Sequence, residues 1–178
     1  KVGPIIIVIF FALLLAIWFS TPNAFSTFIM VVILMFIGVP LYVMIKLSTD
    51  EKFTERFFDK TSWFFDRLFQ LWYTSADAQN VVSKLGLSKQ SIALDYGCGA
   101  GITTSHLANK AKNVIAVDIS EQQMKLAMKK TKHKNNVTFF KHSQMPEMEN
   151  YFDAATAVGV LEYMKDPKKE VSKIINSL

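Results

Sequence analysis

The stretch Leu94–Gly101, LDYGCGAG, decides the fold of the second half of this chain. Residues 91–96 lead into it as a short apolar run that predicts a strand, and residues 102–110 predict a helix directly after it. Glycines allow a tight turn and a close approach to a ligand, because they carry no Cβ atom. A glycine-rich turn between a strand and its helix therefore predicts a ligand site at the carboxyl end of the strand.

The alternation of short apolar runs and amphipathic stretches continues from this point to the end of the chain. Strands are predicted over residues 113–117, 136–140 and 152–160, the last with the small and apolar character of a strand buried on both faces. Further helices begin at Ser120, where a capping-box pattern occurs, and at Asp166-Pro167. This alternation predicts an α/β fold with a parallel sheet.

Asp118 ends the second predicted strand, about 20 residues after the first glycine of the turn. An acidic side chain at this place can accept hydrogen bonds from both hydroxyls of a ribose. The dinucleotide-binding pattern G-x-G-x-x-G is not met, because its sixth position is Ile102, and a phosphate-binding P-loop is excluded by the absence of G-K-[ST]. The sequence reads D-x-G-x-G-x-G instead.

This pattern resembles motif I of the class I S-adenosylmethionine-dependent methyltransferases, in particular the type 11-like family. The resemblance spans roughly residues 85–178 and includes Val117-Asp118, Phe152-Asp153 and the segment 159–167, GVLEYMKDP. It implies a Rossmann-like parallel sheet, S-adenosyl-L-methionine as the cofactor and transfer of its methyl group by in-line displacement. Since the leaving group is a neutral thioether, the protein has to align the acceptor and exclude water.

The resemblance also implies roles for individual residues of this sequence. Asp95 is expected to orient the methionine end of the cofactor, and Asp118 to hold the ribose. Gly97, Gly99 and Gly101 are expected to form the loop beneath the cofactor. No metal site is expected, and the single cysteine, Cys98, excludes a cysteine zinc cluster and an internal disulfide.

The sequence departs from the family after the third strand, where many relatives carry an acid that meets the adenine amino group. Residues 141–146, KHSQMP, contain no acid, so His142, Ser143, Gln144 or the backbone is the candidate for this contact, and Gln144 is counted with the cofactor-binding residues. The family also continues with three more strands after the last helix. We therefore expect the sequence to be part of a longer protein that holds the first four strands.

A general base is needed only for an acceptor that must lose a proton, and no residue stands out as that base. Glu162 and Tyr163 are expected near the mouth of the site, with helix capping and packing as the alternative role. His142 is a third candidate, with the alternative that it is an idle surface histidine.

The first half of the chain is of a different kind, since residues 2–45 contain no charged residue and no histidine. Residues 4–20 and 24–45 are apolar runs long enough for helices of roughly 25–33 Å, close to the thickness of a bilayer core. The short polar link 21–23 predicts that they form a transmembrane helical hairpin over residues 1–47. A signal peptide is the alternative for the first run.

Charge sets the expected orientation of this hairpin. Lys1 and Lys46 flank its two ends, and the link carries no charge, so the positive-inside rule places both ends and the soluble domain in the cytoplasm. Gly38 and Pro40 are expected to kink the second helix or to end it early. The predicted localisation is therefore integral membrane, with two transmembrane helices.

Residues 48–84 form a predicted amphipathic linker between the hairpin and the methyltransferase-like domain of residues 85–178. An aromatic-rich helix is predicted over residues 50–73, with an apolar row at helical spacing made by Phe53, Phe57, Phe64, Leu68 and Leu71. It either lies in the membrane interface or packs on the domain. As an interfacial helix it is expected to form a wall of the acceptor's path, with Phe57, Phe64 and Trp72 as the residues to test.

The net charge of +5 does not by itself indicate a nucleic-acid partner, and none is predicted. The lysines of residues 125–141 form a solvated helix surface or a patch that meets anionic lipid headgroups. The predicted partners are the lipid bilayer and a membrane-protein complex. Two functions follow: a methyltransferase that acts on a lipid, quinone or other membrane-borne acceptor, or an accessory subunit of a membrane complex that keeps the fold and has lost turnover.

Overall fold

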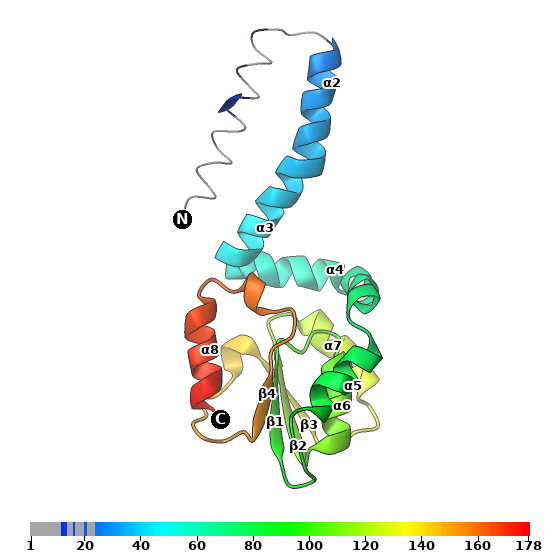
Figure 1. Cartoon of the computed structure of the whole chain (residues 1–178), viewed down its shortest axis with the longest axis vertical. Coiled ribbons are helices and arrows are strands. Elements are labelled where there is room, and N and C mark those ends of the chain that lie inside the picture. Colours follow the sequence, from blue (N-terminus) through cyan, green and yellow to red (C-terminus); the bar gives the residue numbers. More distant parts are fainter. Residues whose placement is uncertain (1–11, 14–15, 17–19, 21–23) are drawn as a thin grey trace. The chain divides into compact units, whose positions relative to one another are not determined.

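The computed structural model describes residues 12–13, 16, 20 and 24–178, and the chain divides into two compact units, Lys1–Lys46 and Leu47–Leu178 (Figure 1). Most of the predicted first membrane span and the whole link 21–23 lie outside the described residues. Of the two predicted membrane helices, the structure therefore describes the second one.

This second helix is long and apolar. It is built from α2 (Ala24–Ile33), the π-helical turn η1 (Leu34–Gly38) and α3 (Val39–Thr49). Within the described part of the chain, the stretch Thr27–Thr49 is the one candidate membrane span, with 23 residues, and its most apolar 18-residue window has a mean hydropathy of 2.8. At 1.5 Å per residue it measures about 35 Å, which is enough to cross a bilayer core.

The π-helical turn lies where a kink was predicted. The backbone N–H of Val39 donates to the carbonyl of Leu34, five residues earlier. A wider turn of this kind accommodates Pro40, which has no N–H and whose ring crowds the preceding turn of an α-helix. The helix then continues to Thr49, so the predicted alternative that it ends early is wrong.

The second unit begins with two helices. Asp50 caps α4 (Glu51–Trp72) by accepting a hydrogen bond from the N–H of Phe53 at 3.1 Å, which confirms the predicted aromatic helix. The short helix α5 (Ser75–Ser83) was not predicted. It starts with a capping box in which Thr74 and Asp77 bond each other's backbone N–H groups.

The centre of this unit is a four-stranded parallel sheet with the order β3-β2-β1-β4, as the predicted α/β fold requires. Its strands are β1 (Ile92–Tyr96), β2 (Asn113–Asp118), β3 (Val137–Lys141) and β4 (Ala154–Thr156). The helices α6 (Ile102–Lys110), α7 (Glu121–Lys130) and α8 (Pro167–Asn176) follow the strands as predicted, together with the 3-10 turns η2 (His142–Gln144) and η3 (Leu161–Tyr163).

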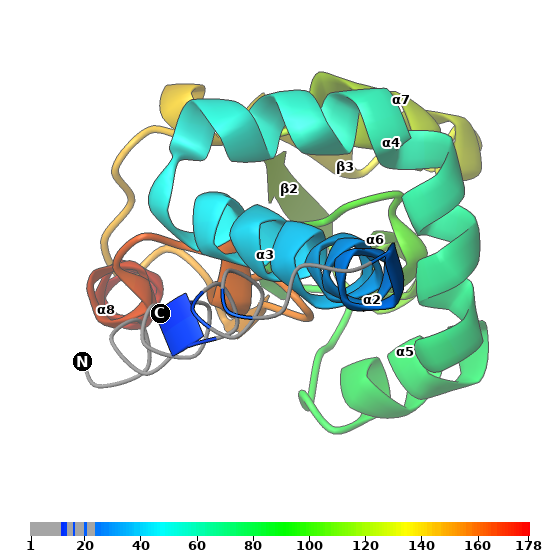
Figure 2. The ribbon, with the colours of Figure 1, turned by 90° about the horizontal axis from the view of Figure 1, so that it is seen from above.

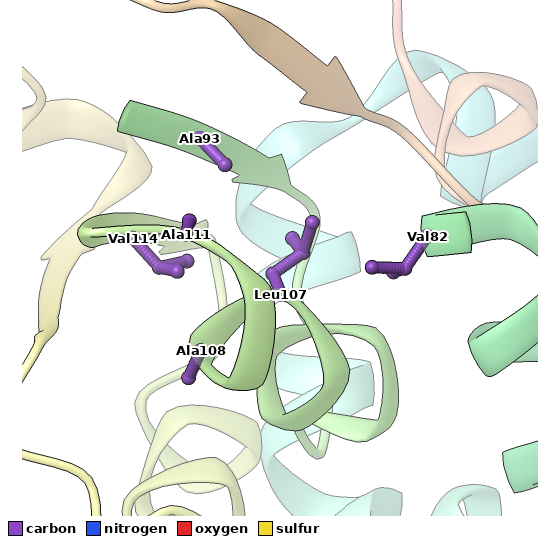
Figure 3. Close-up of a cluster of buried hydrophobic side chains, with 6 residues drawn as sticks. All are labelled: Val82, Ala93, Leu107, Ala108, Ala111 and Val114. Carbon is purple, nitrogen blue, oxygen red and sulfur yellow. The ribbon is translucent and has the colours of Figure 1, made fainter. Parts of the chain in front are cut away.

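Successive side chains of the strands enter different cores, because they point to opposite faces of the sheet. On one face, Ala93 and Val114 pack with Val82 of α5 and with Leu107, Ala108 and Ala111 of α6 and its end (Figure 3). On the other face, Leu94, Ile115 and Val117 pack with Phe152 and with Ile174 of α8. Helices on both faces fix the sheet, so that the carboxyl ends of its strands stay free to build a site.

The fourth strand is shorter than predicted, covering three of the nine expected residues. Gly159 has a φ of +63°, a left-handed conformation that no strand contains and that glycine adopts without strain. The chain therefore turns away after Thr156, and Val158, Gly159 and Val160 become part of a cavity wall.

Candidate functional site

A cavity of about 380 Å³ lies within the second unit at the carboxyl ends of β1 and β2. The glycine loop, the residues that follow β2 and the turn after β4 line one side of it. Helix α4 lines the other side, and Figure 2 shows this helix running beside α7 across the end of the sheet. This is the place at which the sequence predicted a ligand.

Asp95 lies near the end of β1 with 2% of its surface exposed. One carboxylate oxygen accepts a hydrogen bond from the hydroxyl of Thr104 at 2.6 Å, and the other accepts one from Thr156 at 2.9 Å. Burial raises the pKa of Asp95 to about 6, although the two hydroxyls act in the opposite direction. A cation bound in the cavity would favour the charged carboxylate, as expected for a group that orients an ammonium-bearing ligand.

The three glycines of the loop have left-handed φ values, but they face different surroundings. A Cβ atom on Gly97 would lie 2.4 Å from Val160 Cγ2, and one on Gly101 would lie 2.7 Å from Ala127 Cβ. A Cβ atom on Gly99 would meet no atom within 4 Å, and Gly99 lines the cavity. Gly97 and Gly101 are thus required by packing, whereas Gly99 leaves space for a ligand.

Asp118 ties the loop to the end of β2. Its carboxylate accepts hydrogen bonds from the N–H of Gly99 at 2.8 Å and from the N–H of Ser120 at 2.9 Å, and burial raises its pKa. An ionised carboxylate has about four acceptor positions, so two remain for a ligand in the cavity that Asp118 lines. This geometry fits the predicted contact with two ribose hydroxyls.

Gln144, the predicted adenine-side residue, is exposed and does not line the cavity. Gln123 lies in the wall instead, with 6% of its surface exposed. Its Oε1 atom is buried and has no hydrogen-bond partner among the described residues. A buried carbonyl oxygen without a partner is costly, so it is a natural acceptor for an amino group of a ligand.

In the capping-box pattern that begins at Ser120, Gln123 is the second residue, and only half of that box forms. The N–H of Gln123 donates to Ser120 Oγ at 3.2 Å. The reciprocal bond does not form, because the N–H of Ser120 donates to Asp118. The side chain of Gln123 is therefore released from helix capping, which sequence alone did not reveal.

His142 lines the cavity within a small polar cluster. Its Nε2 atom lies 2.6 Å from the hydroxyl of Tyr96, which donates to a carboxylate oxygen of Glu170 at 2.6 Å. Burial and this bond raise the pKa of Tyr96, so the tyrosine keeps its proton. The other ring nitrogen of His142, Nδ1, lies 3.9 Å from a carboxylate oxygen of Glu51.

The other two predicted candidates for a base differ in their position. Tyr163 lines the cavity and packs edge-on against Phe58, with ring centroids 5.2 Å apart. Burial raises its pKa, which makes it a poor base near neutral pH. Glu162 is exposed and lies outside the cavity wall. The structure thus brings His142 and Tyr163 to the site and leaves Glu162 outside it.

Helix α4 contributes Thr54, Phe58, Phe65 and Phe69 to the cavity. This row is displaced by one residue from the predicted row, so Phe57, Phe64 and Trp72 do not line the cavity. Their part in the path of a membrane-borne acceptor stays a prediction. The aromatic residues of α4 cover most of its circumference, so the sequence does not show which of them are buried. The buried side is decided by where the domain contacts the helix.

Polar contacts hold α4 over the cavity. Glu55 pairs with Lys141 at 2.5 Å, and Asp59 accepts a hydrogen bond from Ser120 Oγ at 2.6 Å. A third pair joins Asp66 to Lys130 at 3.6 Å. The packing alternative for the linker helix therefore holds for this inner side of α4.

The chemistry of the wall is divided. Buried carboxylates, backbone N–H groups and the free oxygen of Gln123 lie on the sheet side. Helix α4 contributes aromatic rings together with the carboxylates of Glu51 and Asp66, and the Oδ1 atom of Asp66 is buried without a hydrogen-bond partner among the described residues. In the described part of the chain, no group of three or more His, Cys, Asp or Glu side chains is placed to hold a metal ion. Burial raises the pKa of the Cys98 thiol, which makes it unreactive.

Comparison with known proteins agrees with this picture. The family model described as "Methyltransferase domain" matches residues 94–178. The Ubiquinone biosynthesis O-methyltransferase of Psychrobacter cryohalolentis is 28% identical over 101 residues, which cover 53% of this chain and 38% of that protein. The Magnesium-protoporphyrin O-methyltransferase of Rhodobacter capsulatus is 30% identical over 87 residues, which cover 48% of this chain and 38% of that protein. The chain thus spans less than half the length of these relatives.

Solved structures show the same fold. Phosphoethanolamine N-methyltransferase 1 of Haemonchus contortus, in complex with phosphoethanolamine and S-adenosylhomocysteine, matches 71% of this chain and 29% of its own, with a TM-score of 0.58 and 22% identity. Magnesium protoporphyrin IX methyltransferase of Synechocystis with bound S-adenosylhomocysteine matches 71% of this chain and 65% of its own, with a TM-score of 0.55 and 22% identity. Residues 94–178 are therefore similar to a methyltransferase domain, and the fold is the one that these solved methyltransferases share.

Proposed function

We propose that this chain is a membrane-anchored methyltransferase that uses S-adenosylmethionine and acts on a lipid, quinone or other membrane-borne acceptor. The observation that carries the proposal is the arrangement of Gly99 and Asp118. The N–H of Gly99 is bonded to Asp118, and the space above its Cα atom is open to the cavity. A glycine loop that is held by Asp118 and borders open cavity space can receive a ligand without rearranging.

The residues present fit the methyl donor. Asp118 has acceptor positions left for ribose hydroxyls, Gln123 offers its unpartnered oxygen to the adenine amino group, and Asp95 offers its buried carboxylate to the methionine ammonium group. When bound, S-adenosylmethionine supplies a methyl group on a sulfonium centre.

The aromatic side of the cavity suits an apolar acceptor. Phe58, Phe65 and Phe69 line the cavity from α4, and Tyr163 lines it from η3. Two of the similar proteins are named for ubiquinone biosynthesis and for magnesium protoporphyrin, and both ubiquinone and protoporphyrin are largely apolar molecules. By alignment of donor and acceptor in this enclosed space, the chain's side chains supply proximity and exclude water.

For an acceptor with a hydroxyl group, His142 is the proposed base. Its Nδ1 atom would take the proton of the hydroxyl, so that the oxygen could accept the methyl group that a bound sulfonium would supply, with a neutral thioether as the leaving group. Tyr96 and Glu170 hold the ring through Nε2, which fixes the atom that faces the acceptor.

Membrane anchoring is supported by the apolar helix Thr27–Thr49 and by the sequence of residues 4–20. The proposed topology has two spans and a cytoplasmic domain. An accessory subunit of a membrane-protein complex remains the second candidate function, because Gln144, the residue predicted to contact the adenine, does not line the cavity. The unpartnered oxygen of Gln123 favours the enzyme.

Methyl transfer can be tested with the full chain in nanodiscs, S-adenosylmethionine labelled in its methyl group, and membrane extracts as a source of acceptor. We expect label in an organic-soluble product. Replacing Phe58, Phe65 and Phe69 together by Ser should abolish it and leave S-adenosylhomocysteine binding within a few-fold. The matched control replaces Met128, Tyr151 and Ile175 by Ser, three exposed large apolar residues that do not line the cavity. Binding without transfer from any extract would favour the accessory subunit.

A further inference from the structure

The outward side of α4 is as distinctive as the side that lines the cavity. We define the outer face of α4 by the exposed basic and large apolar residues that it carries: Lys52, Arg56, Lys60, Trp63, Phe64, Arg67, Leu68, Leu71 and Trp72. Trp63 is 68% exposed, Leu71 77% and Trp72 84%. Large apolar side chains so exposed on one helix mark a surface that contacts another apolar phase.

Charge on α4 is separated between its two sides. The acids turn to the domain, where Glu55 pairs with Lys141, Asp66 with Lys130, and Asp59 with Ser120. The bases of the outer face have no acidic partner within 4 Å among the described residues. The acids of α4 are therefore used up by partners in the domain, and the outer face of α4 is left with a positive charge.

Basic residues interleaved with exposed tryptophans match the surface of an anionic bilayer. Tryptophan favours the level of the lipid headgroups, and the long stems of Lys and Arg bury methylenes while the charge stays among the phosphates. Anionic lipids attract such a helix, which lies in the plane of the interface. Docking into a groove of another protein would not by itself require both basic and large apolar side chains on the exposed side of α4.

The position of α4 in the chain identifies the source of these phosphates. The candidate membrane span ends at Thr49 and α4 begins at Glu51, so one residue separates them. A helix that starts so close to the end of a span cannot leave the bilayer surface by more than a few ångströms at its first turn. Free phosphate or a soluble anionic partner would not need this placement.

We propose that the outer face of α4 docks on the anionic surface of the bilayer in which the chain is anchored. The same helix then contacts lipid with one side and the cavity with the other, so an acceptor in the bilayer needs to pass a single layer of side chains. The inference rests on the membrane part of the proposed function and is independent of methyl transfer.

The test uses the full chain in nanodiscs of brominated phosphatidylcholine, with or without phosphatidylglycerol. Trp18 is the one other tryptophan besides Trp63 and Trp72, so the variant Trp18→Phe reports on α4 alone. We expect a blue-shifted emission and strong quenching by the brominated chains, both greater when phosphatidylglycerol is present. Co-elution of the chain with the nanodiscs is measured first, and its failure would refute the anchoring rather than the docking.

Charge reversal supplies the decisive comparison. Replacing Lys52, Lys60 and Arg67 by Glu should remove the dependence on phosphatidylglycerol. The matched control makes the same change in charge at Lys84, Lys110 and Lys112, which are exposed and lie at the opposite end of the sheet, and should keep it. Equal quenching in neutral and anionic nanodiscs would overturn the proposal. Absence of quenching in both would do so as well, and would point to a protein partner for this face.

Discussion

Adding a single methyl group to the glycine loop should separate folding from ligand binding, because two of its glycines are required for different reasons. A Cβ atom on Gly97 would lie 2.4 Å from Val160, far inside van der Waals contact, whereas a Cβ atom on Gly99 would enter open cavity space. The variants Gly97→Ala and Gly99→Ala are therefore expected to fail in different assays.

The magnitudes follow from the backbone and from packing. Both positions have left-handed φ values, +76° and +50°, which cost an alanine about 1–2 kcal/mol. Gly97→Ala adds the cost of overpacking, about 1–3 kcal/mol, for a total of about 2–5 kcal/mol. Gly99→Ala should lose about 1–2 kcal/mol of stability, but its methyl group occupies ligand space. We expect at least a tenfold loss of affinity, about 1.4 kcal/mol.

Thermal unfolding and calorimetric titration with S-adenosylhomocysteine measure the two effects on the same samples. Gly97→Ala should show the larger drop in the midpoint of unfolding. Gly99→Ala should unfold within several degrees of the wild type and bind weakly. If Gly99→Ala binds like the wild type, the ligand does not lie over this loop and the site assignment is wrong.

Three further results are expected. Asp95→Asn should stabilise the ligand-free protein increasingly as the pH rises from about 4 to 6, because the Asp95 carboxyl of the folded wild type keeps a proton that the unfolded chain releases. The difference in the free energy of unfolding should reach about 3 kcal/mol for two pKa units. If the free energy of unfolding changes with pH by the same slope in both proteins, this expectation is refuted. Gln123→Leu should weaken the binding of S-adenosylhomocysteine more than that of S-inosylhomocysteine, which lacks the amino group. The control Gln122→Leu, at an exposed position, should leave the preference for the adenosyl ligand unchanged. If that preference survives in Gln123→Leu, the contact with the amino group is excluded. A cysteine at Asn23 should react with an impermeant thiol reagent in intact cells, and labelling only after permeabilisation would contradict the predicted topology.

Much of the fold follows from local pattern. The helix of residues 102–110 is found with its predicted bounds, and the strands around Leu94 and Ile115 appear as predicted, since a parallel sheet buried on both faces leaves a strong apolar signature. The end of β4 could not be predicted from apolar character alone, because residues that line a cavity are as apolar as residues inside a sheet. Gly159 was the available signal, through its ability to end a strand.

The site was predictable where it depends on the backbone and unpredictable where it depends on competition between side chains. The glycine loop and Asp118 were found because their spacing reflects the turn itself. Gln123 was missed because Asp118 takes the N–H group that a capping box would use, a contact between two elements. The cavity-lining row of α4 was missed by one residue for the same reason, since the domain decides which side of an aromatic helix is buried.

The central claim is that the carboxylate of Asp118 and the loop around it bind the nucleoside of S-adenosylmethionine. Calorimetric titration of the full chain with S-adenosylmethionine, in the wild type and in Asp118→Ala, tests it most directly. The account predicts one site in the wild type and a loss of about 1–3 kcal/mol in the variant, the scale of hydrogen bonds to a charged group. No binding by the wild type, or equal binding by both folded proteins, would contradict it.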